Sequence, residues 1–153
     1  MAPVSAQDSA IIHHKKAQYC RLSDCGQWDE LAPIFLDSCK FIFTDPQDNI
    51  VDEGGIYYDF PTKDKFFGFL KSSMSLLQTI HIVGPAELEQ TAPDEIKAVW
   101  PLTYQTATKG PAGGFHGTGG GHYFETWKKV GDDWFIGDLK MKRIFWKTVI
   151  YPE

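Results

Sequence analysis

The spacing of hydrophobic residues changes half-way along the chain. From Leu77 onward, hydrophobic and polar residues alternate with a period of two, which is typical of strands that bury one face. A glycine-rich segment, residues 110–121, separates the middle two strands, and its composition indicates a hairpin connection or the rim of a pocket. The pattern predicts strands at about residues 79–88, 95–106, 122–130 and 134–146.

The first half of the chain has mainly helical spacing. Asp8 or Ser9 can cap a helix that runs to about Asp24, and Gly26 suits the position just after its end. Helices followed by a mostly antiparallel sheet are typical of the α+β class, and we expect one domain spanning residues 1–153. The remaining predicted elements are a short helical piece at 27–35, short strands at 39–44 and 55–60, and a third helix capped by Thr62.

Composition narrows the classes of function. The formal net charge is −5 and the Lys and Arg residues are scattered, so we expect no nucleic-acid partner. Three cysteines and an N-terminus without an apolar leader favour a cytoplasmic protein with reduced thiols. No apolar stretch approaches the roughly 20 residues that span a bilayer, so we expect no membrane partner. Abundant aromatic residues suit either a tightly filled core or a cavity for a hydrophobic small molecule.

Asp24 is the first candidate for chemistry. Its carboxylate falls in the last turn of the predicted first helix, where the helix dipole already places partial negative charge. A hydrogen-bonded partner must therefore stabilise it, and an aspartate that holds a histidine is common in general acid–base catalysis. The best partner is His81, which shares one face of its predicted strand with Thr79 and Val83. The alternative is that His81 is a hydrogen-bonded core histidine.

Arg143 is unexpected on a hydrophobic strand face. A period of two places it on the same side of the last strand as Leu139, Met141 and Phe145, with Trp146 on the opposite side. An unpaired buried charge is very costly, so Arg143 must be paired or must contact a ligand. A salt bridge near the strand end is the structural alternative.

Aromatic and histidine side chains complete the predicted substrate-binding site. Trp100 and Tyr104 point inwards in a run of alternating residues, where the Tyr104 hydroxyl needs a partner. Tyr19 lies about one helical turn before Asp24 and can line the same cavity. His122, just after the glycines, can face either the cavity or solvent. Core packing is the alternative for both tyrosines.

The spacing of potential ligands does not indicate a metal or phosphate site. Cys20 and Cys25 stand five residues apart, and His116 and His122 lack a third ligand at a convincing spacing. A phosphate-binding loop needs a helix after its glycines, whereas a strand is predicted here. We therefore expect neither a metal nor a cofactor.

These residues carry a resemblance to a known family. Residues 19–31, the strand around His81 and the ending at 125–136 resemble the SnoaL-like branch of the nuclear transport factor 2-like superfamily. Within that branch the chain is similar to scytalone dehydratase and to the bile acid 7α-dehydratases, over roughly residues 10–147. The resemblance implies a cone-shaped barrel, in which a strongly curved, mixed and mostly antiparallel sheet wraps around helices and encloses an apolar pocket. It also implies a homodimer.

The resemblance further implies a type of chemistry. In the dehydratases the residues that match Asp24 and His81 form a catalytic pair, and in the bile acid enzymes the residues that match Tyr19 and Arg143 line the site. Tyr104 departs from this pattern, since it falls about where those enzymes carry a second aspartate. We expect a cofactor-free dehydratase or isomerase/cyclase that acts on a hydrophobic, oxygenated ring intermediate of polyketide or terpenoid type. The alternative is a non-catalytic module of the same fold for small-molecule binding or dimerisation.

Overall fold

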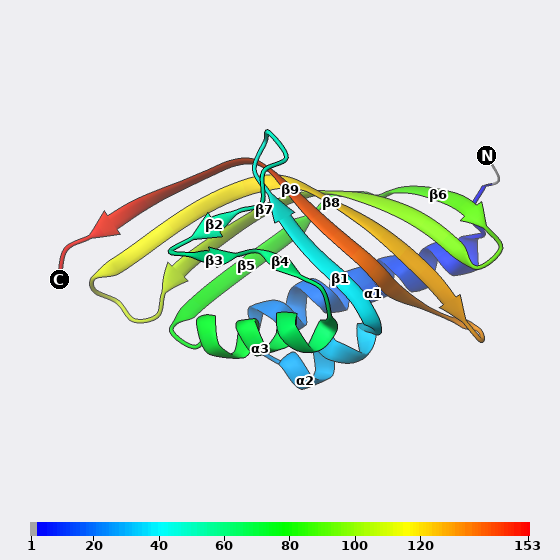
Figure 1. Cartoon of the computed structure of the whole chain (residues 1–153), viewed down its shortest axis with the longest axis horizontal. Helices are drawn as coiled ribbons and strands as arrows, with labels where there is room; N and C mark the ends of the chain where they lie inside the picture. The colour runs from blue at the N-terminus through cyan, green and yellow to red at the C-terminus, as the bar shows by residue number, and fades with distance from the viewer. Residues whose placement is uncertain (1–2) are drawn as a thin grey trace.

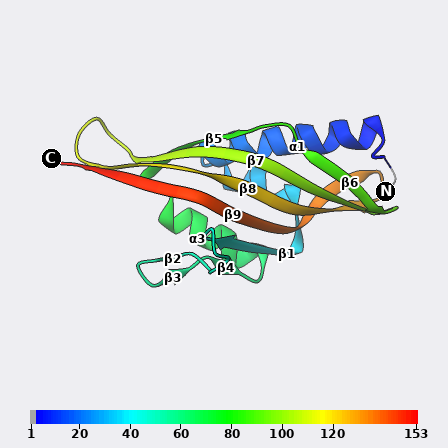
Figure 2. The same cartoon turned by 90° about the horizontal axis from the view of Figure 1, so that it is seen from above.

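Three long strands determine the shape of the molecule. The computed structural model describes residues 3–153. Strands β7 (Glu95–Thr108), β8 (Gly114–Val130) and β9 (Asp133–Tyr151) run along its length and arch over the helices (Figure 1). Helix α1 (Ala6–Asp24) lies beside one edge of the sheet, and α3 (Lys63–Ser73) lies towards the other edge (Figure 2).

The sheet is mixed and mostly antiparallel. Its main strand order is β4-β1-β9-β8-β7-β5, with β6 also paired to β7, and among the strand pairs formed by residues 3–153 only β1 and β9 run parallel. A separate hairpin joins β2 to β3. The predicted α+β class with a curved mixed sheet is therefore confirmed. The remaining elements are α2 (Trp28–Leu31), a 3-10 helix (Ala32–Ile34), β1 (Phe35–Thr44), β2 (Asp52–Glu53), β3 (Ile56–Tyr57), β4 (Asp59–Phe60), β5 (Leu77–Val83) and β6 (Glu87–Ala92).

Side-chain caps begin both long helices. Ser5 caps α1, because its Oγ accepts a hydrogen bond from the Asp8 amide at 3.0 Å. The prediction of Asp8 or Ser9 as the cap was therefore wrong by one turn. Thr62 caps α3 as predicted, accepting from the Lys65 amide at 3.3 Å.

Several strand boundaries differ from the predicted ranges. β1 begins at Phe35, whereas the sequence pattern placed its start at residue 39. The predicted strand at 55–60 is replaced by the short strands β3 and β4. The predicted strand at 79–88 is divided into β5 and β6 around Gly84 and Pro85, because a proline has no N–H group to donate to a ladder.

Most of the glycine-rich segment belongs to β8, and only residues 110–113 lie in the hairpin connection that the sequence pattern suggested for the whole segment. β8 begins at Gly114, so Gly117 and Gly119 lie within it. A Cβ atom on Gly119 would overlap the ring of Tyr104, and one on Gly117 would overlap the ring of Trp146. These glycines therefore provide space for aromatic side chains that extend from the neighbouring strands.

A β-bulge changes which residues of β9 face inwards. Gly121 pairs with Arg143, but Gly120 pairs with Phe145, so Ile144 is an extra residue on β9. Beyond the bulge the alternation is reversed. Phe145 is 44% exposed, whereas Trp146 packs against the core. The prediction that Phe145 shares the inner face with Arg143 was therefore wrong.

A fully buried ion pair lies in the core. Lys16 and Glu125 form a salt bridge with no exposed side-chain surface on either partner. The second carboxylate oxygen of Glu125 accepts hydrogen bonds from the indole nitrogens of Trp100 at 2.8 Å and Trp127 at 2.9 Å. Each charge is thus matched inside a hydrophobic core, as a buried charge requires.

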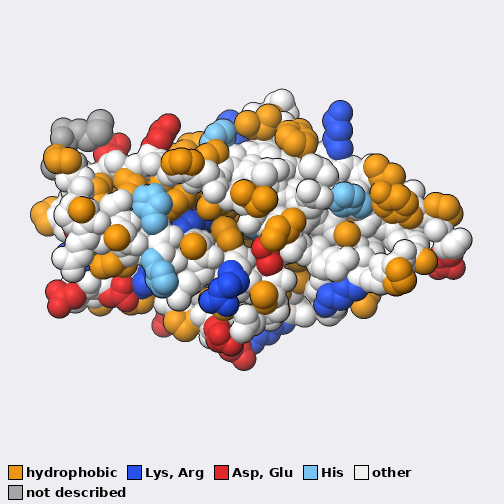
Figure 3. Space-filling view, turned by 180° about the vertical axis from the view of Figure 1, so that it is seen from behind, with side chains coloured by type: hydrophobic (Ala, Val, Ile, Leu, Met, Phe, Trp, Pro, Cys, Tyr) orange, Lys and Arg blue, Asp and Glu red, His pale blue; other side chains and the backbone are white. Residues whose placement is uncertain are grey.

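The surface carries charges of both signs. On the face seen from behind, Lys and Arg side chains stand apart from one another and do not form a continuous stripe (Figure 3). None of the helices formed by residues 3–153 is long and apolar enough to cross a membrane.

Replacing Lys16 tests the role of the buried pair. Lys16→Met leaves the Glu125 carboxylate buried without its cation, so we expect the free energy of unfolding to fall by about 3–5 kcal/mol. Urea-induced unfolding measures the difference. Lys71→Met is the matched control, because Lys71 pairs with the exposed Asp29 and its loss should change stability little. Equal losses in the two variants would contradict the assigned role.

Candidate active site

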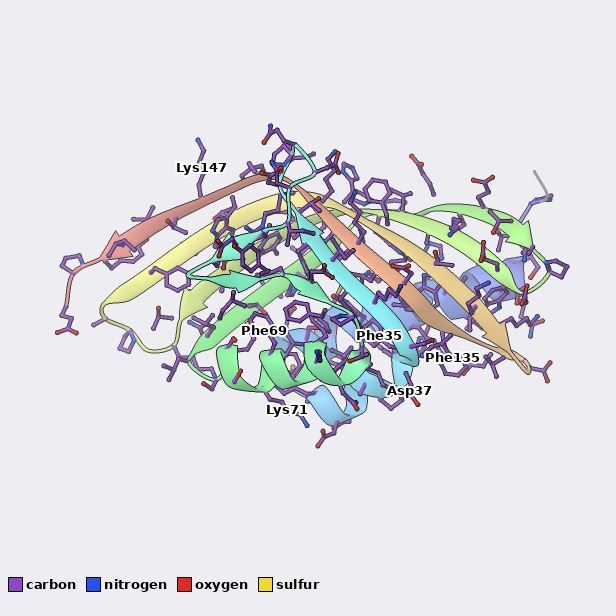
Figure 4. All side chains as sticks on the ribbon, in the orientation of Figure 1. Phe35, Asp37, Phe69, Lys71, Phe135 and Lys147 are labelled. Atoms are coloured by element: carbon purple, nitrogen blue, oxygen red, sulfur yellow. The ribbon has the colours of Figure 1, made fainter. Side chains whose placement is uncertain are left out.

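A cavity of about 180 Å³ lies between the inner face of the sheet and the helices. A cavity of roughly 150 Å³ is enough to bind benzene, so a ring compound fits here. Most of its wall is hydrophobic, with side chains such as Phe69 that project from α3 towards the strands, whereas Lys71 points away from them (Figure 4). On β9, Lys147 points outwards from the sheet (Figure 4). The polar side chains on the wall include His81, Tyr104 and Arg143.

Asp24 joins the end of α1 to the edge strand β5. Its Oδ1 atom lies 2.6 Å from Nδ1 of His81 and accepts a hydrogen bond from the Thr79 hydroxyl at 2.9 Å. Its Oδ2 atom accepts a hydrogen bond from the His81 backbone amide at 3.1 Å. These three interactions stabilise a carboxylate at a helix C-terminus, where the helix dipole disfavours negative charge.

His81 faces the cavity in the orientation predicted from the strand alternation. Ile80 and Ile82 on the opposite face are 49% and 60% exposed, whereas the His81 side chain is only 18% exposed. With Nδ1 donating to Asp24, the neutral imidazole has its lone pair on Nε2. Within residues 3–153, Nε2 has no hydrogen-bond partner. The ring can therefore act as a base towards a molecule in the cavity.

Arg143 and Tyr104 form a second polar group in the cavity. The Arg143 Nε atom donates to the Tyr104 hydroxyl oxygen at 3.0 Å, and the Arg143 Nη2 atom donates to Glu53 at 3.0 Å. Burial raises the pKa of Tyr104, although the neighbouring Arg143 opposes that shift. The phenol therefore keeps its proton at neutral pH, and its O–H group can donate to a ligand while its oxygen accepts from Arg143.

Sheet register brings these groups into one row. His81 pairs with Tyr104, Tyr104 with Gly119, and Gly119 with Trp146 across four neighbouring strands. The His81 and Tyr104 rings are nearly parallel with centroids 6.0 Å apart, and those of Tyr104 and Trp146 are nearly parallel at 5.5 Å. The base and the phenol thus face the same cavity from adjacent strands.

Tyr19 lines the cavity from α1. It is 5% exposed, and its hydroxyl donates to that of Tyr123 at a long distance of 3.4 Å. The Lys16 ammonium group lies 3.9 Å from the centroid of the Tyr19 ring and 3.6 Å from that of Tyr123. The buried ion pair therefore lies directly behind this part of the cavity wall.

Two predicted site residues lie away from the cavity. Trp100 points inwards, but it packs in the core with its indole nitrogen bonded to Glu125 and its ring against His13. His122 follows the β8 alternation to the opposite face, where its ring lies near the exposed Phe124. The structure therefore does not place either residue where it could touch a molecule in the cavity.

Sequence reasoning missed several residues that shape the site. Glu53 and Tyr58 belong to short segments without periodicity, so no sequence signal marked them. The period-two pattern placed Trp146 on the outer face because this pattern does not reveal the β-bulge. Lys16 did carry a signal, since Ile12, Lys16 and Tyr19 share one helical face.

Comparison with known sequences gives the family. The SnoaL-like domain family matches residues 4–140. The chain belongs to this family. A relative from Gibberella zeae, the probable cyclase FGR4, is 51% identical over 146 residues, which cover 95% of this SnoaL-like chain and 97% of the relative.

Solved structures share the SnoaL-like fold at low sequence identity. A candidate scytalone dehydratase from Novosphingobium aromaticivorans has a TM-score of 0.73 at 16% identity and covers 94% of this chain and 87% of its own. The hexachlorocyclohexane dehydrochlorinase LinA-type3 from Novosphingobium barchaimii has a TM-score of 0.73 at 13% identity, with 92% and 88% covered. The predicted SnoaL-like branch is confirmed by the family match, and these structures support the fold.

Gly119→Ala tests the space that glycine provides beside the cavity. The added methyl group would displace the Tyr104 ring, so we expect the free energy of unfolding to fall by about 1–3 kcal/mol. Urea-induced unfolding measures the loss. Gly68→Ala is the control, because a Cβ atom there meets no neighbour within 4 Å and alanine favours the α3 helix. The explanation is wrong if Gly119→Ala is as stable as the unaltered chain.

Proposed function

We propose that this SnoaL-like chain is a cofactor-free enzyme of the isomerase/cyclase or lyase type, which uses His81 and Asp24 as its acid–base pair. The observation that carries the proposal is the 2.6 Å contact between His81 Nδ1 and Asp24 Oδ1 at the wall of a ring-sized cavity. The 51% identical probable cyclase from Gibberella zeae supports an enzyme of this type.

The first step is proton removal by His81. Its Nε2 atom takes a proton from a carbon next to a carbonyl group, and the negative charge of Asp24 stabilises the imidazolium that forms. The electrons of the broken C–H bond move to the carbonyl oxygen, which becomes an enolate. Tyr104 donates a hydrogen bond to that oxygen, and Arg143 increases the donor strength of the phenol by binding its oxygen.

The second step depends on which reactive groups the substrate carries. In ring closure, the enolate carbon attacks an electrophilic carbon of the same molecule, and the imidazolium protonates the oxygen that receives the electrons. In isomerisation, the imidazolium returns its proton to a different carbon. In dehydration, it protonates a hydroxyl group that leaves as water. Ring closure and isomerisation leave the mass unchanged, and the cyclase name of the Gibberella zeae relative favours such a reaction.

The cavity wall indicates the substrate class. It is mainly aromatic and aliphatic, with a few polar groups on the side of His81 and Tyr104. A hydrophobic ring compound with a carbonyl group matches this distribution, and polyketide and terpenoid intermediates belong to that class. The non-catalytic alternative required that Asp24 and His81 do not touch or that side chains fill the cavity, and neither condition agrees with the geometry.

The proposed enzyme is a cytoplasmic homodimer. The outer face of the sheet exposes hydrophobic side chains, which supports association through that face. These residues include Ile80, Ile82, Phe124, Ile144, Phe145 and Val149. Size-exclusion chromatography with light scattering measures the oligomeric state. Fractionation of the producing cells tests the cytoplasmic assignment.

Replacing either member of the acid–base pair should abolish most of the activity. Purified protein is offered β-hydroxyketone ring substrates, and products are followed by mass and retention time. His81→Ala and Asp24→Asn should lower kcat by about 10²–10⁴-fold. Asp29→Asn removes an exposed carboxylate and should leave the rate unchanged. Rates of the two site variants within a few-fold of the unaltered enzyme would remove the pair from the mechanism.

Tyr104→Phe tests the proposed enolate donor. Loss of one hydrogen bond that strengthens in the transition state should reduce kcat by roughly 10²–10³-fold, with a much smaller change in KM. Tyr57→Phe, at a tyrosine that is 63% exposed, serves as the control. An unchanged kcat with a raised KM would show that Tyr104 only binds the substrate.

A further inference from the structure

Each cation described at or behind the cavity wall is paired with a carboxylate. Among residues 3–153, the ionisable side chains that line the cavity are Glu53, His81, Arg143 and four tyrosines. Burial raises the pKa of each of these tyrosines, so they keep their protons near neutral pH. Arg143 carries a positive charge whatever the state of the ligand. An unpaired arginine in a hydrophobic cavity would attract carboxylate groups strongly. Whether Arg143 is paired with a carboxylate of the protein therefore affects which ligand charge the cavity accepts.

Glu53 forms an ion pair with Arg143 at the cavity wall. Its Oε1 atom accepts from Arg143 Nη2 at 3.0 Å, and its Oε2 atom accepts from the Tyr58 hydroxyl at 2.7 Å. Burial raises the pKa of Tyr58, so its hydroxyl remains a donor to Glu53. Both carboxylate oxygens are thus held, and the β2–β3 hairpin keeps Glu53 at the cavity although its side chain is 41% exposed.

The cation behind the cavity wall is cancelled in the same way. Lys16 lies against the rings of Tyr19 and Tyr123, which line the cavity, but it is paired with the buried Glu125. Asp24 adds a negative charge next to His81. With His81 neutral, the two cations and three carboxylates described above carry one net negative charge. An anion that enters the cavity therefore finds no unpaired cation, and it loses its hydration.

We propose that Glu53 sets the charge selectivity of the cavity: by neutralising Arg143 it makes the site accept uncharged carbonyl compounds and reject carboxylates. This inference rests on the proposed function, because it concerns the substrate of the same site. An uncharged ketone needs only one donor, which the Tyr104 hydroxyl supplies. A carboxylate would have to compete with Glu53 for Arg143.

The test compares two probes of nearly equal shape. Acetophenone is an uncharged ketone, and benzoate carries a carboxylate near neutral pH. NMR titration of the intact chain gives the Kd of each probe. The unaltered chain should bind acetophenone at least roughly tenfold more tightly than benzoate. Glu53→Gln keeps the side-chain shape but removes the charge, and it should reduce that preference by roughly tenfold or reverse it.

Asp48→Asn is the matched control. It removes the same charge from a surface carboxylate that pairs with Lys140 and Lys142 outside the cavity, so the preference should not change. Equal affinity of the unaltered chain for both probes, an unchanged preference in Glu53→Gln, an equal change in Asp48→Asn or failure of acetophenone to bind would each overturn the proposal. This readout needs no turnover, so its failure is distinct from a failure of the acid–base mechanism.

Discussion

The carboxylate of Asp24 connects the C-terminal end of α1 to the edge strand β5, and the geometry of the site depends on this connection. The C-terminal end of a helix disfavours negative charge, and β5 stabilises the carboxylate there with three hydrogen-bond donors. Two of those donors belong to His81 itself. The same interactions that satisfy the exposed edge of the sheet therefore also fix the imidazole tautomer and its direction towards the cavity.

The rest of the cavity follows from the shape of the sheet. Long strands with strong curvature would normally fill their concave side with side chains, but β8 has no side chains on its inner face at Gly117 and Gly119. Tyr104 and Trp146 extend over that bare backbone from the two neighbouring strands and lie nearly parallel. A flat polar–aromatic wall results, and it faces the base on β5.

Charge pairing keeps this interior compatible with a hydrophobic core. Lys16 and Glu125 cancel each other below the wall, and Glu53 cancels Arg143 within it. Each pair also holds an aromatic residue in place, because Glu125 accepts from two tryptophans and Arg143 donates to Tyr104. Such networks require every member to be satisfied, which links the electrostatics of the site to the packing of the core.

Local patterns in the sequence determined the α+β class, the main helices and the inward direction of His81 and Tyr104, because period and helix-end chemistry act over a few residues. The sequence also suggested His81 as the partner of Asp24, but tertiary structure alone decided several other features of the site. The bulge at Ile144 brought Trp146 inwards, the β2–β3 hairpin brought Glu53 to Arg143, and the register of β8 with β7 and β9 turned His122 outwards. These outcomes depend on register between strands and on contacts between residues up to 90 positions apart, which no local pattern contains.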